Sequence, residues 1–235
     1  VHAPNWIGDA VLSLPAIKGI RDLFPNARMT VLAKKGIAPI FANNPYIDEV
    51  VPIDAGRGAG SIAVPVRFLR GKRFDLGILF PNSFKSALIF FLGGVRYRIG
   101  YAKDLRGVLL THAVKRDNET LKMHHRDYYY RLVRELGNVT HPDAPKVFLN
   151  AETQKWADDA LRAARRGQNR VIGINPGGAY GLAKRWPAER FGELAAMMIS
   201  EWRADVVIFG NERDRDIARV IQDKTGQKCI DMTGK

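Results

Sequence analysis

The sequence predicts an α/β fold with two doubly wound parallel-sheet domains, and three observations lead to this prediction. Segments typical of strands and of helices alternate along all 235 residues, which is the order of repeated βαβ units. The segment "FDLGILF" (74–80) is an almost continuous apolar run, as expected for a strand buried on both faces of a parallel sheet. Hydrophobic residues make up 46% of the chain, which is enough to form a sizeable core.

The first domain is expected over residues 1–150. Strands are expected at 1–3 ("VHA"), 27–34, 48–54 and 74–80, and helices at 10–23, 36–42, 62–70, 83–92 and 119–136. The last helix has the clearest pattern, because residues from Leu121 to Leu136 recur on one face at three- and four-residue steps. Gly137 is suited to end that helix. Pro15 is expected to kink or delay the first one.

The second domain is expected over residues 151–235, beginning with a linker helix at 152–166. Strands are expected at 170–178, 204–210 and 228–234, and helices at 187–202 and 212–226. Three strands and two helices are half of a doubly wound domain, and a parallel sheet with an uncovered face is unusual. We therefore expect the second domain to be truncated in this chain, and a few residues to be missing ahead of "VHA". Two such domains in tandem are expected to form a cleft, with ligands at the carboxyl ends of the strands.

The charge balance of the chain favours anionic partners. Lys and Arg number 37 and Asp and Glu 24, which gives a formal net charge of +13. Nucleic acid, phosphorylated metabolites and anionic lipid surfaces all fit this charge. The longest apolar run, 87–95, is shorter than the roughly 20 residues that a membrane-spanning helix needs, and no secretory signal opens the chain. The single cysteine, Cys229, excludes an internal disulfide and fits a reducing compartment. Neither HExxH nor CxxC occurs, so neither a metal nor a cofactor is expected.

The first candidate site is "NWIGD", residues 5–9, which follows a strand and opens a helix. Gly8 permits a tight turn or the close approach of a ligand. Asp9 lies near the positive end of the helix dipole, which favours its ionised form. Asp9 is therefore either a helix N-cap or a carboxylate that faces a substrate. Asn5 and Trp6 in the same loop are candidates for contact with that substrate. The absence of GxGxxG argues against a dinucleotide site here.

The second candidate site is "NPGGAYGLAKRWP", residues 175–187, a glycine-rich loop between a strand and a helix. The backbone N–H groups of Gly177 and Gly178, together with the helix N-terminus, can hold a diphosphate. Lys184 and Arg185 supply positive charge where a phosphate leaving group develops negative charge. The alternative is a long surface loop with solvated cations. The pattern is not that of a P-loop, because GxxxxGK[ST] is absent.

Two further groups of polar residues follow strands. In "FGNERDRDIA" (209–218), Glu212 or Asp214 can accept hydrogen bonds from ribose hydroxyls, or they can simply favour the start of a helix. In "PNSFKSA" (81–87), Asn82, Ser83 and Lys85 can bind an anion or a sugar, with a serine-capped helix as the alternative.

A basic stretch at 96–106 carries interleaved tyrosines. This pattern suits single-stranded nucleic acid, whose bases stack on aromatic rings. It equally suits the buried face of a strand. The adjacent residues His124 and His125 fall at the start of the 119–136 helix, where a histidine is more often structural than catalytic.

Taken together, these motifs resemble the ADP-heptose:lipopolysaccharide heptosyltransferases, glycosyltransferase family nine, and most closely its heptosyltransferase II branch. The resemblance runs over the whole chain. It rests on "NWIGDAVLSLPAIKGIRDLFP", "FDLGILFPNSFKSALIFFLGGVRYRIGY" and "GINPGGAYGLAKRWPAERF", in that order. It implies the GT-B architecture, in which two Rossmann-like domains face a cleft, the first binding the acceptor and the second the nucleotide sugar.

The resemblance also implies a reaction and a place for it. L-glycero-D-manno-heptose would pass from ADP-heptose to the heptose-bearing Kdo-lipid A inner core of lipopolysaccharide, with inversion at the anomeric carbon. Such an enzyme would work in the cytoplasm of a Gram-negative bacterium, peripherally at the inner membrane, with neither a metal nor nucleic acid. A related transferase with another sugar donor is one alternative. A non-catalytic binder of nucleic acid or anionic lipid on the same fold is another.

The family's site residues carry over to three positions of this sequence. Asp9 would take the proton from the acceptor hydroxyl, Lys184 would bind the diphosphate, and Asp214, or else Glu212, would contact the ribose. A further family motif, Asp-Ser-Gly followed by His, does not occur in this sequence. A chain that lacks it is expected to bind the donor weakly and to show negligible turnover.

Overall fold

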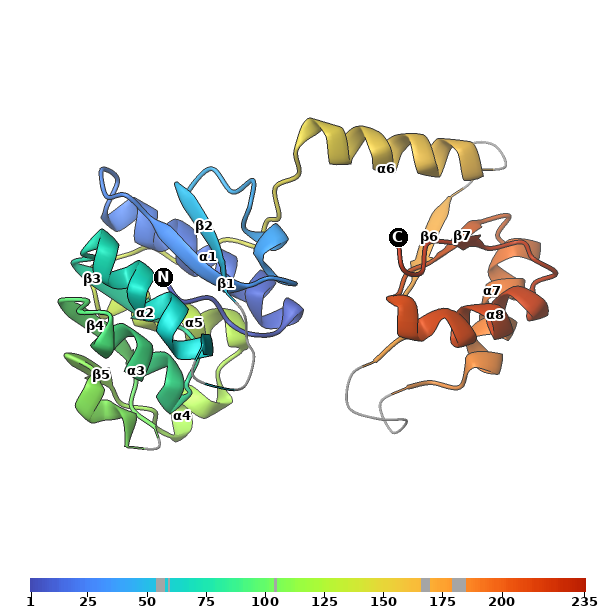
Figure 1. Ribbon diagram of the computed structural model, residues 1–235. Helices are drawn as coiled ribbons and strands as arrows, with labels where there is room; N and C mark the ends of the chain where they lie inside the picture. Colours follow the sequence, from blue (N-terminus) through green and yellow to red (C-terminus); the bar gives the residue numbers. More distant parts are fainter. Residues whose placement is uncertain (54–57, 59, 104, 166–169, 179–184) are drawn as a thin grey trace. The chain divides into compact units, whose positions relative to one another are not determined.

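The computed structural model describes residues 1–53, 58, 60–103, 105–165, 170–178 and 185–235. The chain divides into two compact units, Val1–Asn150 and Ala151–Lys235 (Figure 1). Each unit combines helices with a parallel sheet, so the predicted α/β class is confirmed.

The first unit alternates strands and helices. Its elements are α1 (Ile7–Leu23), β1 (Thr30–Lys34), η1 (Ala38–Ile40), β2 (Glu49–Ile53), α2 (Gly60–Lys72), β3 (Leu76–Leu79), α3 (Phe84–Leu92), β4 (Tyr97–Tyr101), η2 (Arg106–Leu109), β5 (His112–Val114), α4 (Asn118–Lys122) and α5 (His125–Arg134). The first helix begins earlier than expected and continues through the buried Pro15, so the proline does not delay it.

The segment 1–3 joins two groups of strands into one parallel sheet. β1 pairs with β2, and β3, β4 and β5 pair in that order. Between the two groups, His2 donates its backbone N–H to Ile78 and Ala3 donates to Leu32. The short "VHA" segment therefore takes the place of a central strand. The chain winds outward from it first to β1 and β2, and then in the other direction to β3, β4 and β5, which is a doubly wound topology.

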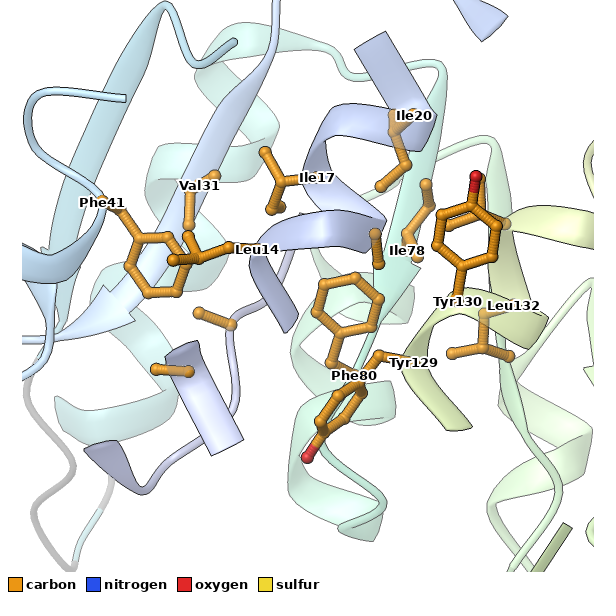
Figure 2. Packing of buried hydrophobic residues seen from close by; sticks show 14 of the residues in the cluster. Leu14, Ile17, Ile20, Val31, Phe41, Ile78, Phe80, Tyr129, Tyr130 and Leu132 are labelled. Carbon is orange, nitrogen blue, oxygen red and sulfur yellow. The ribbon is translucent and has the colours of Figure 1, made fainter. Parts of the chain in front are cut away.

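The core of the first unit lies between α1, α5 and the sheet. Leu14 and Ile17 of α1 pack with Ile78 and Phe80 from the β3 region, and all four are almost fully buried (Figure 2). A Cβ atom at Gly19 would come within 3.0 Å of the Tyr130 ring. Glycine at this position therefore lets α1 and α5 approach closely.

The structure corrects two expectations for the first unit. The helix expected at 119–136 is two helices, because Met123 and His124 have non-helical backbone conformations between α4 and α5. The basic stretch after residue 95 contains strand β4, in which Tyr101 is fully buried while Tyr97 is about half exposed. The reading of those tyrosines as the buried face of a strand is thus right for Tyr101 alone.

The second unit has a three-stranded parallel sheet in the order β6, β7, β8. Its elements are α6 (Ala151–Ala164), β6 (Val171–Ile174), α7 (Ala188–Ser200), β7 (Asp205–Ile208), η4 (Glu212–Asp214), α8 (Arg215–Lys224) and β8 (Ile230–Asp231). α7 packs against α8, where Gly192 allows the backbone to lie against Lys224. Pro187 is the N-cap of α7 rather than part of its first turn. Among the described residues, no helix is long and apolar enough to cross a membrane.

Acid is expected to destabilise the first unit through His2. Burial lowers the pKa of this imidazole to about 3, and its ring stacks on Phe90. The folded protein therefore disfavours the proton that the unfolded chain binds below its ordinary pKa of about 6.5. The contribution of neutral His2 to the free energy of unfolding is therefore fully present above pH 6.5, and it falls as the pH drops towards 3. Between pH 6.5 and 5 the loss is about 1.6 kcal/mol, because the slope reaches its full value of roughly 1.4 kcal/mol per pH unit only below pH 6.5, where the unfolded imidazole is half protonated. Urea unfolding at both pH values checks this, and His2→Phe is expected to reduce the difference.

Candidate functional site

The carboxyl edge of the first sheet gathers the polar loops of the first unit. The loop with Asn5 and Trp6 follows the central segment 1–3, and the loop with Asn82 and Ser83 follows β3, its neighbour in the sheet. From segment 1–3 the chain continues to β1, and from β3 it continues to β4, so the two connections run towards opposite edges of the sheet. In open parallel sheets, ligands bind at such a switch point, outside the carboxyl ends of the strands.

Asp9 lies in the first turn of α1 beside this edge. Trp6 is the N-cap of the helix, so the alternative in which Asp9 is the N-cap is wrong. The Asp9 carboxylate instead contacts α5: its Oδ1 lies 2.8 Å from Nδ1 of His125. It also accepts a hydrogen bond from the hydroxyl of Tyr129. With 24% of its side chain exposed, Asp9 remains accessible to a ligand.

Tyr129 connects Asp9 to the core. Its ring is buried and packs edge-on against Phe80, with 5.2 Å between ring centroids (Figure 2). Burial raises the pKa of the Tyr129 hydroxyl, and the charge of Asp9 and the hydrogen bond to it raise it further. The phenol therefore keeps its proton across the physiological range and donates it to the carboxylate, which holds Asp9 in one position.

Sequence reasoning missed His125 as a partner of Asp9. The adjacent histidines at 124 and 125 were a visible signal, but the two positions differ in role. The His124 side chain accepts a hydrogen bond from the backbone N–H of Arg126 and caps α5. The His125 side chain points to α1, from a position 116 residues away in sequence.

The loop between β3 and α3 adds polar groups at the same edge. Ser83 caps α3 by accepting a hydrogen bond from the backbone N–H of Ser86, as the alternative reading expected. Asn82 donates its side-chain N–H to the Tyr128 hydroxyl at 2.7 Å, so this loop and Asp9 both contact the first turn of α5. Lys85 donates to the Ser61 hydroxyl at 2.6 Å. These contacts bring the predicted acceptor residues of this loop to the edge where Asp9 lies.

A buried cation lies beneath that loop. Arg106 is completely buried, and its Nη1 donates to the carbonyl oxygens of Pro81 and Ser83. Burial lowers the pKa of this guanidinium to about 10, so it stays protonated at neutral pH. Its charge adds to the positive end of α3, which makes the loop attractive to an anionic or electron-rich ligand.

In the loop after segment 1–3, the Trp6 ring is 54% exposed, with Lys34 Nζ 5.9 Å from its centroid.

Gly8 has no structural need to be glycine. Its φ is not positive, and a Cβ atom added there would meet nothing within 4 Å. Since alanine favours a helix by about 1 kcal/mol over glycine, the absence of a side chain at the exposed start of α1 fits the close approach of a ligand better than the tight turn.

In the second unit, the carboxyl edge of the sheet holds the glycine loop. Arg185 donates from Nε and Nη2 to the carbonyl oxygen of Gly178 at 3.1 and 2.9 Å, so it ties the two ends of the loop together. A Cβ at Gly177 would lie 2.6 Å from a carboxylate oxygen of Asp214, which explains a glycine there. Lys184 lies outside the described residues.

The two acidic candidates of the second unit differ in accessibility. Asp214 is 3% exposed, and it accepts a hydrogen bond from the backbone N–H of Asn211 at 3.0 Å. Glu212 is exposed and pairs through both carboxylate oxygens with Arg215, whose hydrogen bond lowers the pKa of the Glu212 carboxyl.

The basic stretch at 96–106 is largely part of the fold. Besides the buried Tyr101 and Arg106, Arg98 donates to the carbonyl oxygens of Val95 and Leu109. Arginine side chains that already donate to backbone carbonyl oxygens have few N–H groups left to bind phosphates. This weakens the alternative in which the stretch binds single-stranded nucleic acid.

Comparison with known proteins gives consistent matches. The sequence profile of glycosyltransferase family 9 (heptosyltransferase) matches residues 65–235. The lipopolysaccharide heptosyltransferase 2 of Escherichia coli K12 is 30% identical over 229 residues, which are 94% of this chain and 65% of that protein. The chain thus spans about two thirds of the length of this relative.

Solved structures match the fold over nearly all of the chain. The E. coli ADP-heptose LPS heptosyltransferase II superposes with a TM-score of 0.81 and 25% identity, covering 99% of this chain and 71% of the other. A glycosyl transferase family 9 protein from Veillonella parvula gives a TM-score of 0.89 at 22% identity, with 99% and 68% covered.

Proposed function

The chain belongs to glycosyltransferase family 9, the heptosyltransferase family, and from this premise we propose that it transfers L-glycero-D-manno-heptose from ADP-heptose to a heptose of the lipopolysaccharide inner core. The resemblance read from the sequence is confirmed at the level of the family, and the α/β units are those of the GT-B glycosyltransferases. The proposed transfer inverts the anomeric centre, and ADP leaves.

The observation that carries this proposal is the position of Asp9. An ionisable carboxylate is held by two α5 side chains at the switch point of the first sheet. We assign this position to the acceptor hydroxyl, because an attacking hydroxyl needs a proton-accepting group beside it as the new bond forms, and Asp9 and its partner His125 both lie there. Asn5, Trp6, Asn82, Ser83 and Lys85 would bind the acceptor around it.

The donor is assigned to the second unit. The backbone N–H groups of Gly177 and Gly178 and the side chains of Lys184 and Arg185 would bind the diphosphate and stabilise its charge as it leaves. Because Asp214 is buried, we assign the ribose contact to Glu212. The exposed carboxylate of Glu212 can accept hydrogen bonds from the ribose hydroxyls when its ion pair with Arg215 opens.

We further propose that the protein works in the cytoplasm, in peripheral contact with the inner membrane that carries the acceptor. Two features of the first unit support this contact. Tyr97 and Val108 are 52% and 82% exposed, and the guanidinium of Arg96 lies 5.1 Å from the Tyr97 ring centre. Exposed apolar groups beside cations suit an anionic lipid surface.

The proposal is tested by donor profiling of the full-length protein. ADP release is measured with heptose-bearing Kdo-lipid A as acceptor, and UDP-glucose and GDP-mannose are compared with ADP-heptose. We expect kcat/KM for ADP-heptose to exceed the others by about 100-fold or more, because a site built for one base and sugar leaves polar groups unpaired with another.

Two results would contradict this assignment. An equal or higher rate with another sugar nucleotide would identify a related transferase with a different donor. Binding of anionic lipid or single-stranded nucleic acid without binding of any sugar nucleotide would identify a non-catalytic binder.

A further inference from the structure

Asp9 and His125 are arranged so that the carboxylate fixes the tautomer of the imidazole. Asp9 Oδ1 lies 2.8 Å from Nδ1 of His125, and an ionised carboxylate can only accept, so the proton of the neutral ring is on Nδ1. Nε2 is then the accepting nitrogen. The His125 side chain is 66% exposed, against 24% for Asp9, so the imidazole is the more accessible member of the pair.

The Asp9 carboxylate already serves two donors of the protein. It accepts from Nδ1 of His125 and from the Tyr129 hydroxyl. Both contacts engage the carboxylate before an acceptor hydroxyl arrives. A free imidazole, with a pKa of about 6.5, is also better matched to proton transfer near neutral pH than a free aspartate, at about 3.9.

We propose that Nε2 of His125, oriented by Asp9, is the atom that accepts the proton of the acceptor hydroxyl. This rests on the proposed transferase function. The acceptor oxygen forms a bond to the anomeric carbon of the donor, and the bond from that carbon to the diphosphate oxygen breaks. The diphosphate leaves with the electron pair of the broken bond, and the hydroxyl proton passes to Nε2. Asp9 stays ionised and stabilises the imidazolium, as the carboxylate of a catalytic triad does.

The surroundings of the imidazole support this assignment. From α1, it faces Asp9. On α5 itself, the rings of Tyr128 and Tyr129 lie 6.4 and 6.5 Å from the imidazole centre, and the neighbouring Arg126 turns to the carboxylate that follows it. From β4, Tyr101 stacks on Tyr128 and donates its hydroxyl to the Tyr128 carbonyl oxygen at 2.6 Å. Among the described residues, the charged side chain in contact with the imidazole is therefore a carboxylate, which favours the imidazolium formed in the step.

The test compares His125→Gln and His125→Ala with the wild-type full-length protein. Glutamine at 125 is expected to lower kcat by about 100-fold or more, the usual contribution of a general base, with little change in the KM for ADP-heptose. Wild-type kcat/KM is expected to fall towards acidic pH, because a protonated imidazole cannot accept the hydroxyl proton, and this acidic limb is expected to vanish in His125→Gln. Added imidazole is expected to restore part of the activity of His125→Ala. The matched control is His112→Gln, an exposed histidine whose Nε2 lies 3.8 Å from Glu135.

A second measurement needs no substrate. Nitrogen-15 NMR of the imidazole side chains distinguishes the two neutral tautomers. We expect His125 to carry its proton on Nδ1 above pH 8, and the Asp9→Ala variant to lose this preference.

Three results would overturn the proposal. One is a His125→Gln variant with more than a third of the wild-type kcat. Another is a loss of activity with an unchanged pH profile and no rescue by imidazole, which would make His125 a positioning residue only. The third is a proton on Nε2 of His125. Failure of the transferase function is distinguishable, because the wild-type protein itself would then show no heptose transfer.

Discussion

Replacing Asp9 by Asn is expected to reduce heptose transfer by about 10²- to 10⁴-fold, which is the range for loss of a group that takes part in proton transfer. The amide has the shape of the carboxylate but neither its charge nor its basicity. It can still form hydrogen bonds with His125 and Tyr129. It cannot, however, hold the imidazole in the required tautomer or stabilise an imidazolium. The loss is therefore expected whether the proton ends on Asp9 or on His125.

Donor binding separates this effect from a loss of structure. The donor is assigned to the second unit, so isothermal titration calorimetry with ADP-heptose is expected to give the same Kd for Asp9→Asn and the wild type. The matched control is Asp22→Asn, on the same helix, where the carboxylate pairs with Lys18 at the surface. Asp22→Asn is expected to keep full activity, since an exposed pair of this kind contributes under about 1 kcal/mol. Undiminished transfer by Asp9→Asn would remove Asp9 from the mechanism.

The alternation of strands and helices could be predicted from the sequence because each element carries its own local signal. The apolar run at 74–80 contains β3, and Ser83 caps the helix that follows. β4 and β5 were missed because Arg98 and His112 interrupt their apolar pattern. In β4, the side chain of Arg98 is satisfied by backbone carbonyls, which a pattern of residue types does not reveal.

The candidate site was only partly predictable for a different reason. Asp9 could be selected from its place between a strand and a helix, and its partners could not. His125 reaches it because α1 and α5 pack closely at Gly19 and Tyr130, and that contact is a property of the folded chain. The break at Met123 and His124 mattered as well, because it makes His125 the first residue of a new helix instead of a position inside a longer one.

Replacing Phe80 by Ala is expected to destabilise the first unit strongly and to lower turnover as well. Phe80 is 1% exposed and lies directly after β3. Truncation of a buried phenylalanine costs about 3–5 kcal/mol in the free energy of unfolding. The same ring supports Tyr129 edge-on, and Tyr129 holds Asp9. A shift of about 1 Å in a catalytic group can cost up to about 10²-fold in rate, so we expect kcat to fall about ten- to a hundredfold at a temperature where the variant is folded.

Phe90→Ala is the control that makes this prediction specific. Phe90 is 2% exposed and belongs to the other apolar cluster of the same unit, where it lies against Gly77. Its truncation is expected to cost about the same 3–5 kcal/mol and to leave Tyr129 in place. Urea unfolding measures the two free energies, and ADP release at 15 °C, roughly the temperature of greatest stability for many domains, measures turnover. Equal loss of turnover in both variants would show that Asp9 depends on the general stability of the unit. A loss of turnover confined to Phe80→Ala would establish that Phe80 positions Asp9 through its contact with Tyr129.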